Sequence, residues 1–544
     1  MKKSLVIWLL MLAAAMVIPA AAQVSLGNTG SSKSSSGKKQ RVEPSVAWSV
    51  SEPLGLHYPS TIDTIHLDYH LTMVPTGVSD AWLTTGNYGA PGQNQVFMER
   101  PLMSEFFFED AITAWMHDTG NMRYYNTRIP MTLLSHSTGG DKYSNLDRTK
   151  LEFSGNVDRK TQVGVGLDYI YSKGSYDAQA DKDFTWRLFG SHIGDRYEMQ
   201  TFFNHYNYTT KESGGITDDR YITDPAEVQG GETKVDNKSI PTRLSATHNH
   251  LEGSQLYLNQ RYKVGFYRYR RDSVTDTIID RTYVPVTSFI WTLDFKHAKH
   301  QFLNKSGGED KSFFDHTYLG LGGTDETTSY WRLRNTVGVS MLEGFNKYAK
   351  FGFAVYGTHE VRRYTQVTDS VTGTALPEGL EPVPAVVPHR LTQNLLWIGG
   401  QLTKQRGSLL RYNATAQFGV LGDAAGEIDI TGDVTTRFKM LGDTVSIKGY
   451  GYFKNLAVPY LLKNFVSNHF VWENDFSKTK RVRVGGELDI PFSWTNVNVG
   501  YETLNDYIYW DADGLPAQHS GAVHVLSARL RQGLHFKAFN WENS

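Results

Sequence analysis

The sequence predicts an all-β fold, a large antiparallel transmembrane β-barrel of about 16 to 18 strands. Three observations predict it. The chain begins with an export signal, it carries long runs in which apolar and polar residues alternate, and no later segment offers the roughly 20 apolar residues of a membrane-spanning helix. Because lipid leaves every backbone polar group to be paired inside the protein, strands can cross a membrane only as a closed sheet.

The first 22 residues are typical of a secretory signal peptide. Lys2 and Lys3 precede an apolar stretch at 5–18, and Ala20-Ala21-Ala22 supplies the small residues of a cleavage site, so we expect cleavage near Ala22. Residues 23–42 are rich in Ser, Gly and Lys and predict a flexible linker. The chain has no cysteine, so its stability cannot depend on disulfides.

The remainder divides into two parts. Residues 43–130 are rich in Pro, Gly and aromatic residues and contain short strand-like pieces, so we expect an ordered region that lies in the lumen or at the rim. From residue 131 to residue 544 the alternation persists, and this part is expected to form the barrel.

The stretch "TQVGVGLDYIYS" at 161–172 illustrates the alternation. If it is extended, Val163, Val165 and Leu167 share one face, whereas Gly164 and Asp168 lie on the other. The same pattern recurs at 289–296, 332–341, 351–355 and 428–438. We expect the apolar face to contact lipid and the polar face to line a wet interior. A soluble sandwich or propeller is the alternative, but a propeller should show a fixed repeat, and none is evident.

The connections between these runs fall into two classes. Tight-turn residues occur at 158–160, 194–195 and 441–443, and long polar stretches occur at 209–254, 303–327 and 365–390. Transmembrane barrels place short turns on the periplasmic side and long loops outside. The alternation of short and long connections breaks between residues 390 and 500, which leaves the strand number open by about two.

Charged residues on the polar face are the candidate pore-lining groups. Arg and Lys facing lipid at the membrane midplane would cost about 2–4 kcal/mol each, so charges two residues apart on one face should point into the lumen. The candidates are Arg261, Lys263, Asp294, Lys296, Arg332, Arg334, Asp429, Asp433, Arg437, Arg481, Arg483, Arg529 and Arg531. They could either screen solutes by charge or pair with each other and close the lumen.

Several segments resemble those of a known family. These are "GNYGAPGQNQVFMERP" at 86–101, "FFFEDAITAWMHDTGNMRYYNTRIPMTLLSHSTGG" at 106–140, "VSNHFVWENDF" at 466–476 and "GLPAQHSGAVHVLSARLRQG" at 514–533. Their order resembles that of the putative porin family of Bacteroidetes outer membranes. The resemblance implies a β-barrel in the outer membrane of a Gram-negative cell, and it implies no catalytic residues.

We therefore expect a porin that allows passive diffusion of small polar solutes through a charged lumen. The alternatives are a plugged barrel that acts as a scaffold or partner in an envelope complex, and an energised outer-membrane transporter. Expected partners are outer-membrane lipid and lipopolysaccharide, small polar solutes and further copies of the chain. A net charge of -1 argues against nucleic acid. We expect no enzymatic activity, cofactor or metal, because no motif for one is present.

The C-terminal residues "FNWENS" suggest an incomplete barrel. Bacterial single-chain barrels have an even number of strands, and a barrel removes its sheet edges only when its first and last strands meet. The family resemblance also implies that the chain continues. We therefore predict an open seam, with the strand at 131–137 lacking a partner from 534–542 and with further strands following.

Overall fold

The computed structural model describes residues 45–62, 81–127, 129–141, 144–271, 278–367, 379–383, 387–407, 409–440, 442–537 and 539–544. The chain divides into Met1–Pro44 and Ser45–Ser544, and all described residues belong to the second unit. The predicted signal peptide and linker therefore lie outside the described residues. Among the described residues, no helix is long and apolar enough to cross a membrane.

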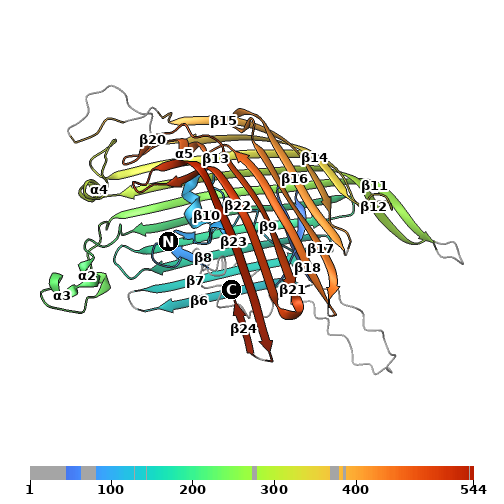
Figure 1. The fold of residues 1–544 in the computed structure, drawn as a ribbon, viewed down its shortest axis with the longest axis horizontal. Helices are drawn as coiled ribbons and strands as arrows, with labels where there is room; N and C mark the ends of the chain where they lie inside the picture. The colour runs from blue at the N-terminus through green and yellow to red at the C-terminus, as the bar shows by residue number, and fades with distance from the viewer. Residues whose placement is uncertain are drawn as a thin grey trace, which may run out of the picture. The chain divides into compact units, whose positions relative to one another are not determined.

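Within the described residues, seventeen strands form one closed barrel in which each strand pairs antiparallel with the next along the sheet from β6 to β24 (Figure 1). The strands are β6 (Met131–Gly140), β7 (Asn145–Asn156), β8 (Thr161–Lys173), β9 (Ala180–Ile193), β10 (Tyr197–Glu212), β11 (Thr247–Arg271), β12 (Ile278–Asn304), β13 (Thr324–Met341), β14 (Gly352–Thr365), β15 (Arg390–Lys404), β16 (Leu410–Leu421), β17 (Ile428–Met440), β18 (Asp443–Leu456), β21 (Thr479–Ile490), β22 (Thr495–Trp510), β23 (Pro516–Phe536) and β24 (Phe539–Asn543). The predicted fold class and strand number are confirmed.

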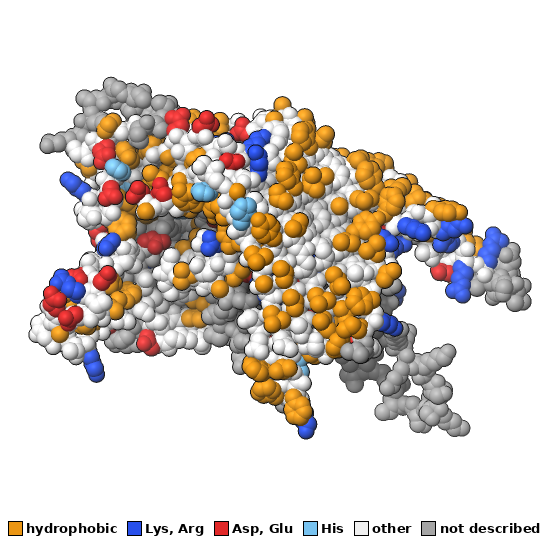
Figure 2. Space-filling view, in the orientation of Figure 1, with side chains coloured by type: hydrophobic (Ala, Val, Ile, Leu, Met, Phe, Trp, Pro, Cys, Tyr) orange, Lys and Arg blue, Asp and Glu red, His pale blue; other side chains and the backbone are white. Residues whose placement is uncertain are grey.

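The alternation predicted from the sequence decides which face of each strand points outward. On β8, Val163 is exposed while Asp168 and Ser172 are buried, and on β12 Phe289 is exposed while Asp294 is buried. Figure 2 shows hydrophobic side chains spread over the outer surface of the sheet. An apolar exterior around a polar interior is the arrangement of a barrel whose outer face contacts lipid.

All four connections longer than ten residues lie at the same end of the barrel. They span 213–246, 305–323, 366–389 and 457–478, whereas the connections at the other end span ten residues or fewer. The long connections carry α2 (Arg220–Thr223), α3 (Pro225–Val228), η6 (Asn237–Ser239), α4 (Gly307–Phe313) and α5 (Tyr460–Lys463), and shorter ones carry η7 (Gly422–Ala424) and η8 (Pro491–Ser493). By the loop-length rule this is the outer end of the barrel, and the other is the inner end.

The break in the predicted alternation of connections has a structural cause. Residues 457–478 contain α5 and the hairpin of β19 (Asn464–Val466) and β20 (Val471–Glu473), and Leu461, Leu462 and Val466 are buried within the barrel. An apolar connection that fills the lumen resembles a lipid-facing strand in sequence. Once it is counted as a long outer connection, all connections longer than ten residues lie at one end, and the rest of the break comes from the short outer connection at 422–427.

The predicted open seam is wrong, because β24 and β6 are hydrogen-bonded neighbours in the closed barrel. The sequence predicts a last strand over 534–542, whereas β23 continues to Phe536 and the chain turns at Lys537, which has φ 55°. This tight turn lets the short β24 fold back on β23 and reach β6.

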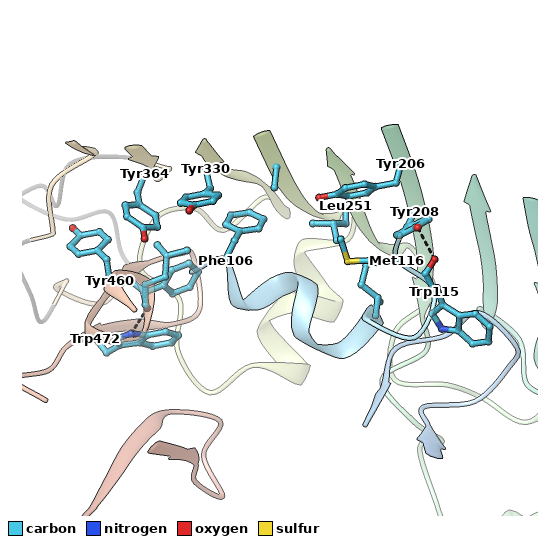
Figure 3. Packing of buried hydrophobic residues seen from close by; sticks show 14 of the residues in the cluster. Phe106, Trp115, Met116, Tyr206, Tyr208, Leu251, Tyr330, Tyr364, Tyr460 and Trp472 are labelled. Atoms are coloured by element: carbon cyan, nitrogen blue, oxygen red, sulfur yellow. Dashed lines mark hydrogen bonds between the residues drawn. The ribbon is translucent and has the colours of Figure 1, made fainter. Parts of the chain in front are cut away.

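The described part of the N-terminal region lies inside the barrel. It forms a sheet of β1 (Val46–Ser51), β2 (Leu56–Ser60) and β5 (Tyr124–Asn126), a hairpin of β3 (Trp82–Thr84) and β4 (Gly92–Asn94), and the short helices η4 (Phe97–Glu99) and η5 (Phe107–Ile112). Its apolar side chains pack on inward-facing barrel residues: Figure 3 shows Phe106 beside Tyr330, and it shows the Tyr208 hydroxyl donating a hydrogen bond to the backbone carbonyl of Trp115. Tyr460 and Trp472 of the 457–478 connection join the same cluster.

A candidate passage through the partly filled lumen

Four acidic residues of the described N-terminal region, Glu52, Glu99, Glu105 and Glu109, form ion pairs with the barrel wall. Glu109 is bound by the Lys296 ammonium at 2.5 Å and accepts a hydrogen bond from the Tyr206 hydroxyl at 2.5 Å. Glu105 pairs with Arg362 at 2.6 Å, and Glu52 pairs with Arg334 at 3.3 Å. Charge-assisted bonds of this kind are directional, so together they fix where the N-terminal region sits in the lumen.

A cavity of about 920 Å³ remains along the part of the wall formed by β13 to β22. We call it the wall cavity. Its charged lining residues come from both the wall and the N-terminal region and include Glu52, Arg100, Glu105, Asp110, Arg334, Glu360, Arg362, Glu427, Asp429 and Arg481. It reaches from Trp510 at the outer end of β22 to Asn413 near the inner end of β16. The cavity therefore extends over most of the height of the sheet.

A second cavity, of about 610 Å³, lies between the N-terminal region, the outer strand ends and the outer connections. We call it the outer cavity. The two cavities share the lining residues Gln93, Asp110 and Trp510, so they adjoin at this point. The rings of Phe107 and Trp510 meet here edge to face, with their centroids 5.3 Å apart.

The predicted pore-lining charges near the N-terminal region are largely engaged with it. Arg261 donates to the carbonyl of Leu54 at 3.0 Å, in addition to the pairs of Lys296 and Arg334 described above. Arg529 pairs with Glu99 of η4. These side chains hold the N-terminal region in place, and among them only Arg334 lines the wall cavity.

Other predicted charges pair within the wall itself. Asp294 binds Arg332 at 2.5 Å, Asp429 binds Lys454 at 2.7 Å, and Lys263 pairs with Glu198. Arg481 and Arg483 share the buried Glu502, at 2.7 and 4.0 Å.

The remaining predicted charges lie nearer the inner end of the barrel. Asp433 is half-buried, and Arg437 and Arg531 are exposed. Both β17 and β23 carry their large exposed apolar residues at even-numbered positions, so these odd-numbered residues lie on the lumen side.

Several charged groups of the lumen are not among the residues predicted from the sequence. Glu360 and Arg362 on β14, and Glu502 on β22, follow the same spacing rule on the polar face and could have been found by it. Glu105 and Glu109 lie in an irregular segment that has no periodicity, so no pattern marked them.

Burial changes the titration of several groups in the N-terminal region, among them Asp110 and His117. Burial raises the pKa of Asp110 to about 7, although the hydrogen bonds from Ser104 oppose this shift. Burial lowers the pKa of His117, although Asp168, 3.7 Å away, opposes the shift. Asp110 lies where the two cavities adjoin, so it can change its charge near neutral pH at that junction.

The family model described as "Putative porin" matches residues 47–544. The chain belongs to the putative porin family. Its family and its barrel place it in the outer membrane. A comparison with curated proteins gave no match.

Solved structures of similar fold include siderophore receptors. The receptor PirA from Acinetobacter baumannii is 10% identical, with a TM-score of 0.48, and the match covers 76% of this chain and 61% of that one. A variant of the ferric enterobactin receptor PfeA from Pseudomonas aeruginosa, in complex with enterobactin, is 8% identical, with a TM-score of 0.49 and the same coverage. This porin-family chain therefore spans about three-fifths of the length of these receptors.

Proposed function

We propose that this protein is an outer-membrane channel through which small polar solutes diffuse along the wall cavity, beside the seated N-terminal region and without any enzymatic step. The observation that carries the proposal is the wall cavity itself, which holds about 920 Å³ and runs over most of the height of the sheet. Membership of the putative porin family supports a role in solute passage.

The chemistry of the wall cavity suits hydrated solutes. Charges of both signs line it, including Arg334, Glu360 and Asp429, together with uncharged polar groups such as Thr415 and Thr431. Polar lining groups can replace part of the hydration shell of a solute, and fixed charges in a narrow passage select among solutes by their charge.

Cysteine labelling tests this route, because the chain contains no cysteine of its own. Thr431 lines the wall cavity, and its neighbour Ile430 is 46% exposed on the lipid-facing side of the same strand. In planar bilayers, a charged methanethiosulfonate reagent should reduce the conductance of Thr431→Cys and leave that of Ile430→Cys unchanged. Equal effects on both variants would show that solutes do not pass along this wall.

The second candidate is a barrel closed by its N-terminal region, which serves as a scaffold or opens only when energy is supplied. The buried pair of Glu109 with Lys296 favours this candidate, because it joins the N-terminal region to the wall in a site shielded from water. A wild-type protein that is silent in bilayers, together with conductance in a Lys296→Met variant, would favour this closed state over the open channel.

Export to this location is part of the same proposal. We infer that the signal peptide is removed after Ala22, so that the mature chain starts at Gln23. Mass spectrometry of the protein purified from membranes measures this directly. A mature chain that retains residues 1–22 would contradict the cleavage.

A further inference from the structure

The outer cavity differs in chemistry from the wall cavity. Its aromatic lining residues are Phe107, Phe108, Tyr208, Phe302, Phe314, Phe465, Phe470, Trp472 and Trp510. Its carboxyl groups are those of Asp110, Glu212 and Glu326, and among its described lining residues there is no Lys or Arg. The lining imidazoles of His300 and His469 are stacked on Phe108 and Phe314, at 3.8 and 3.9 Å between ring centroids.

The partners that the structure gives these carboxyl groups are neutral. Glu212 accepts a hydrogen bond from the Asn249 amide at 2.9 Å, and Glu326 accepts one from the backbone N–H of Asn468 at 2.7 Å. Asp110 accepts from the backbone N–H of Ser104 at 3.2 Å. The Lys296 ammonium interacts electrostatically with Asp110 without contacting it, because this ammonium is bound by Glu109. A carboxyl group in a largely apolar space keeps its negative charge more readily when a positively charged guest lies beside it, so this lining favours a cation.

Trp510 supplies an aromatic surface at the junction of the two cavities. Its side chain remains 42% exposed, although it points into the lumen between Phe107 and Trp472. Both neighbours meet it edge to face, with interplanar angles of 64° and 73°, so neither ring is stacked on the indole. An accessible indole next to carboxylates is suited to an organic cation, because the face of the ring carries partial negative charge.

We propose that the outer cavity is a binding site for organic ammonium ions, held by the Trp510 indole and the carboxyl groups of Asp110, Glu212 and Glu326. The inference rests on the proposed channel, for which it names the favoured solute class: cations that carry an aliphatic or aromatic body. The same lining repels anions, because the described lining residues include no Lys or Arg that could form an ion pair with them.

Calorimetry on the purified full-length protein in detergent tests the site with choline as the probe. The control ligand is 3,3-dimethylbutan-1-ol, which has nearly the shape of choline but no charge. We expect choline to bind at least tenfold more tightly than this alcohol, and gluconate and glucose to show no binding. Equal binding of choline and the alcohol, stronger binding of glucose, or no binding of choline would each overturn the proposal.

Variants locate the binding in the outer cavity. Glu326→Gln, Asp110→Asn and Trp510→Leu should each weaken choline binding severalfold, whereas Glu232→Gln, which removes an exposed outer-loop carboxylate outside the cavity lining, should not. Unchanged binding in all three cavity variants would overturn the assignment. The comparison of choline with its uncharged analogue uses the wild-type protein, so it stands even if a variant fails to fold. Because calorimetry requires no transport, a protein that binds choline but conducts nothing would contradict only the channel.

Discussion

Replacing Lys296 with Met should release the N-terminal region from its contacts with the barrel wall, and we call the released form the unseated state. Glu109 is 3% exposed, and its charge is bound by the Lys296 ammonium and the Tyr206 hydroxyl. Removing one partner of a buried ion pair leaves the other charge uncompensated and costs about 3–5 kcal/mol. Since each 1.4 kcal/mol is a factor of ten, the balance between seated and unseated states should shift by roughly 100- to 4,000-fold.

Hydrogen exchange followed by mass spectrometry measures this shift in the full-length protein. Backbone amides of residues 103–117 should exchange faster by roughly that factor, while those of β7 to β10 keep their protection. The double variant Glu109→Gln with Lys296→Met buries no charge, so it should restore slow exchange. Lys299→Met is the matched control, because Lys299 lies on the same strand with its side chain on the opposite face.

Two results would refute this reasoning. If the exchange of residues 103–117 in Lys296→Met equals that of the wild type, the ion pair does not hold the N-terminal region in place. If the double variant exchanges as fast as the single variant, the loss comes from packing of the lysine stem and not from the uncompensated charge of Glu109.

Three further outcomes are expected. Arg481→Gln with Arg483→Gln should shift the reversal potential of the channel towards cations and lower the melting temperature, because both arginines neutralise the buried Glu502. Cation preference should increase as the pH rises from 6 to 8, because Asp110, whose pKa burial raises to about 7, then loses its proton, and Asp110→Asn should weaken this dependence. The native protein should be recovered in the outer-membrane fraction and should migrate faster on gels before heating than after it; recovery in the soluble fraction would contradict the location.

The barrel could be predicted from the sequence because apolar and polar residues alternate within individual strands. Val163 and Phe289 face outward, and Asp168 and Asp294 face inward, in agreement with the alternation. The seating of the N-terminal region could not be predicted, because the pair of Glu109 with Lys296 joins residues 187 positions apart. The connection at 457–478 was missed because its buried apolar residues look the same in sequence whether they face lipid or an inner cluster.

The inward-facing residues also explain why one part of the lumen is filled and another is open. On β10 and β11 the inward positions include Tyr206, Tyr208 and Tyr257, which are almost fully buried against the N-terminal region. On β16 and β17 they include Thr415 and Thr431, which line the wall cavity. Aromatic rings lose water favourably when another segment covers them, whereas short hydroxyl side chains leave space and stay hydrated. The side-chain type at inward positions therefore acts together with the ion pairs to decide which part of the wall the N-terminal region covers.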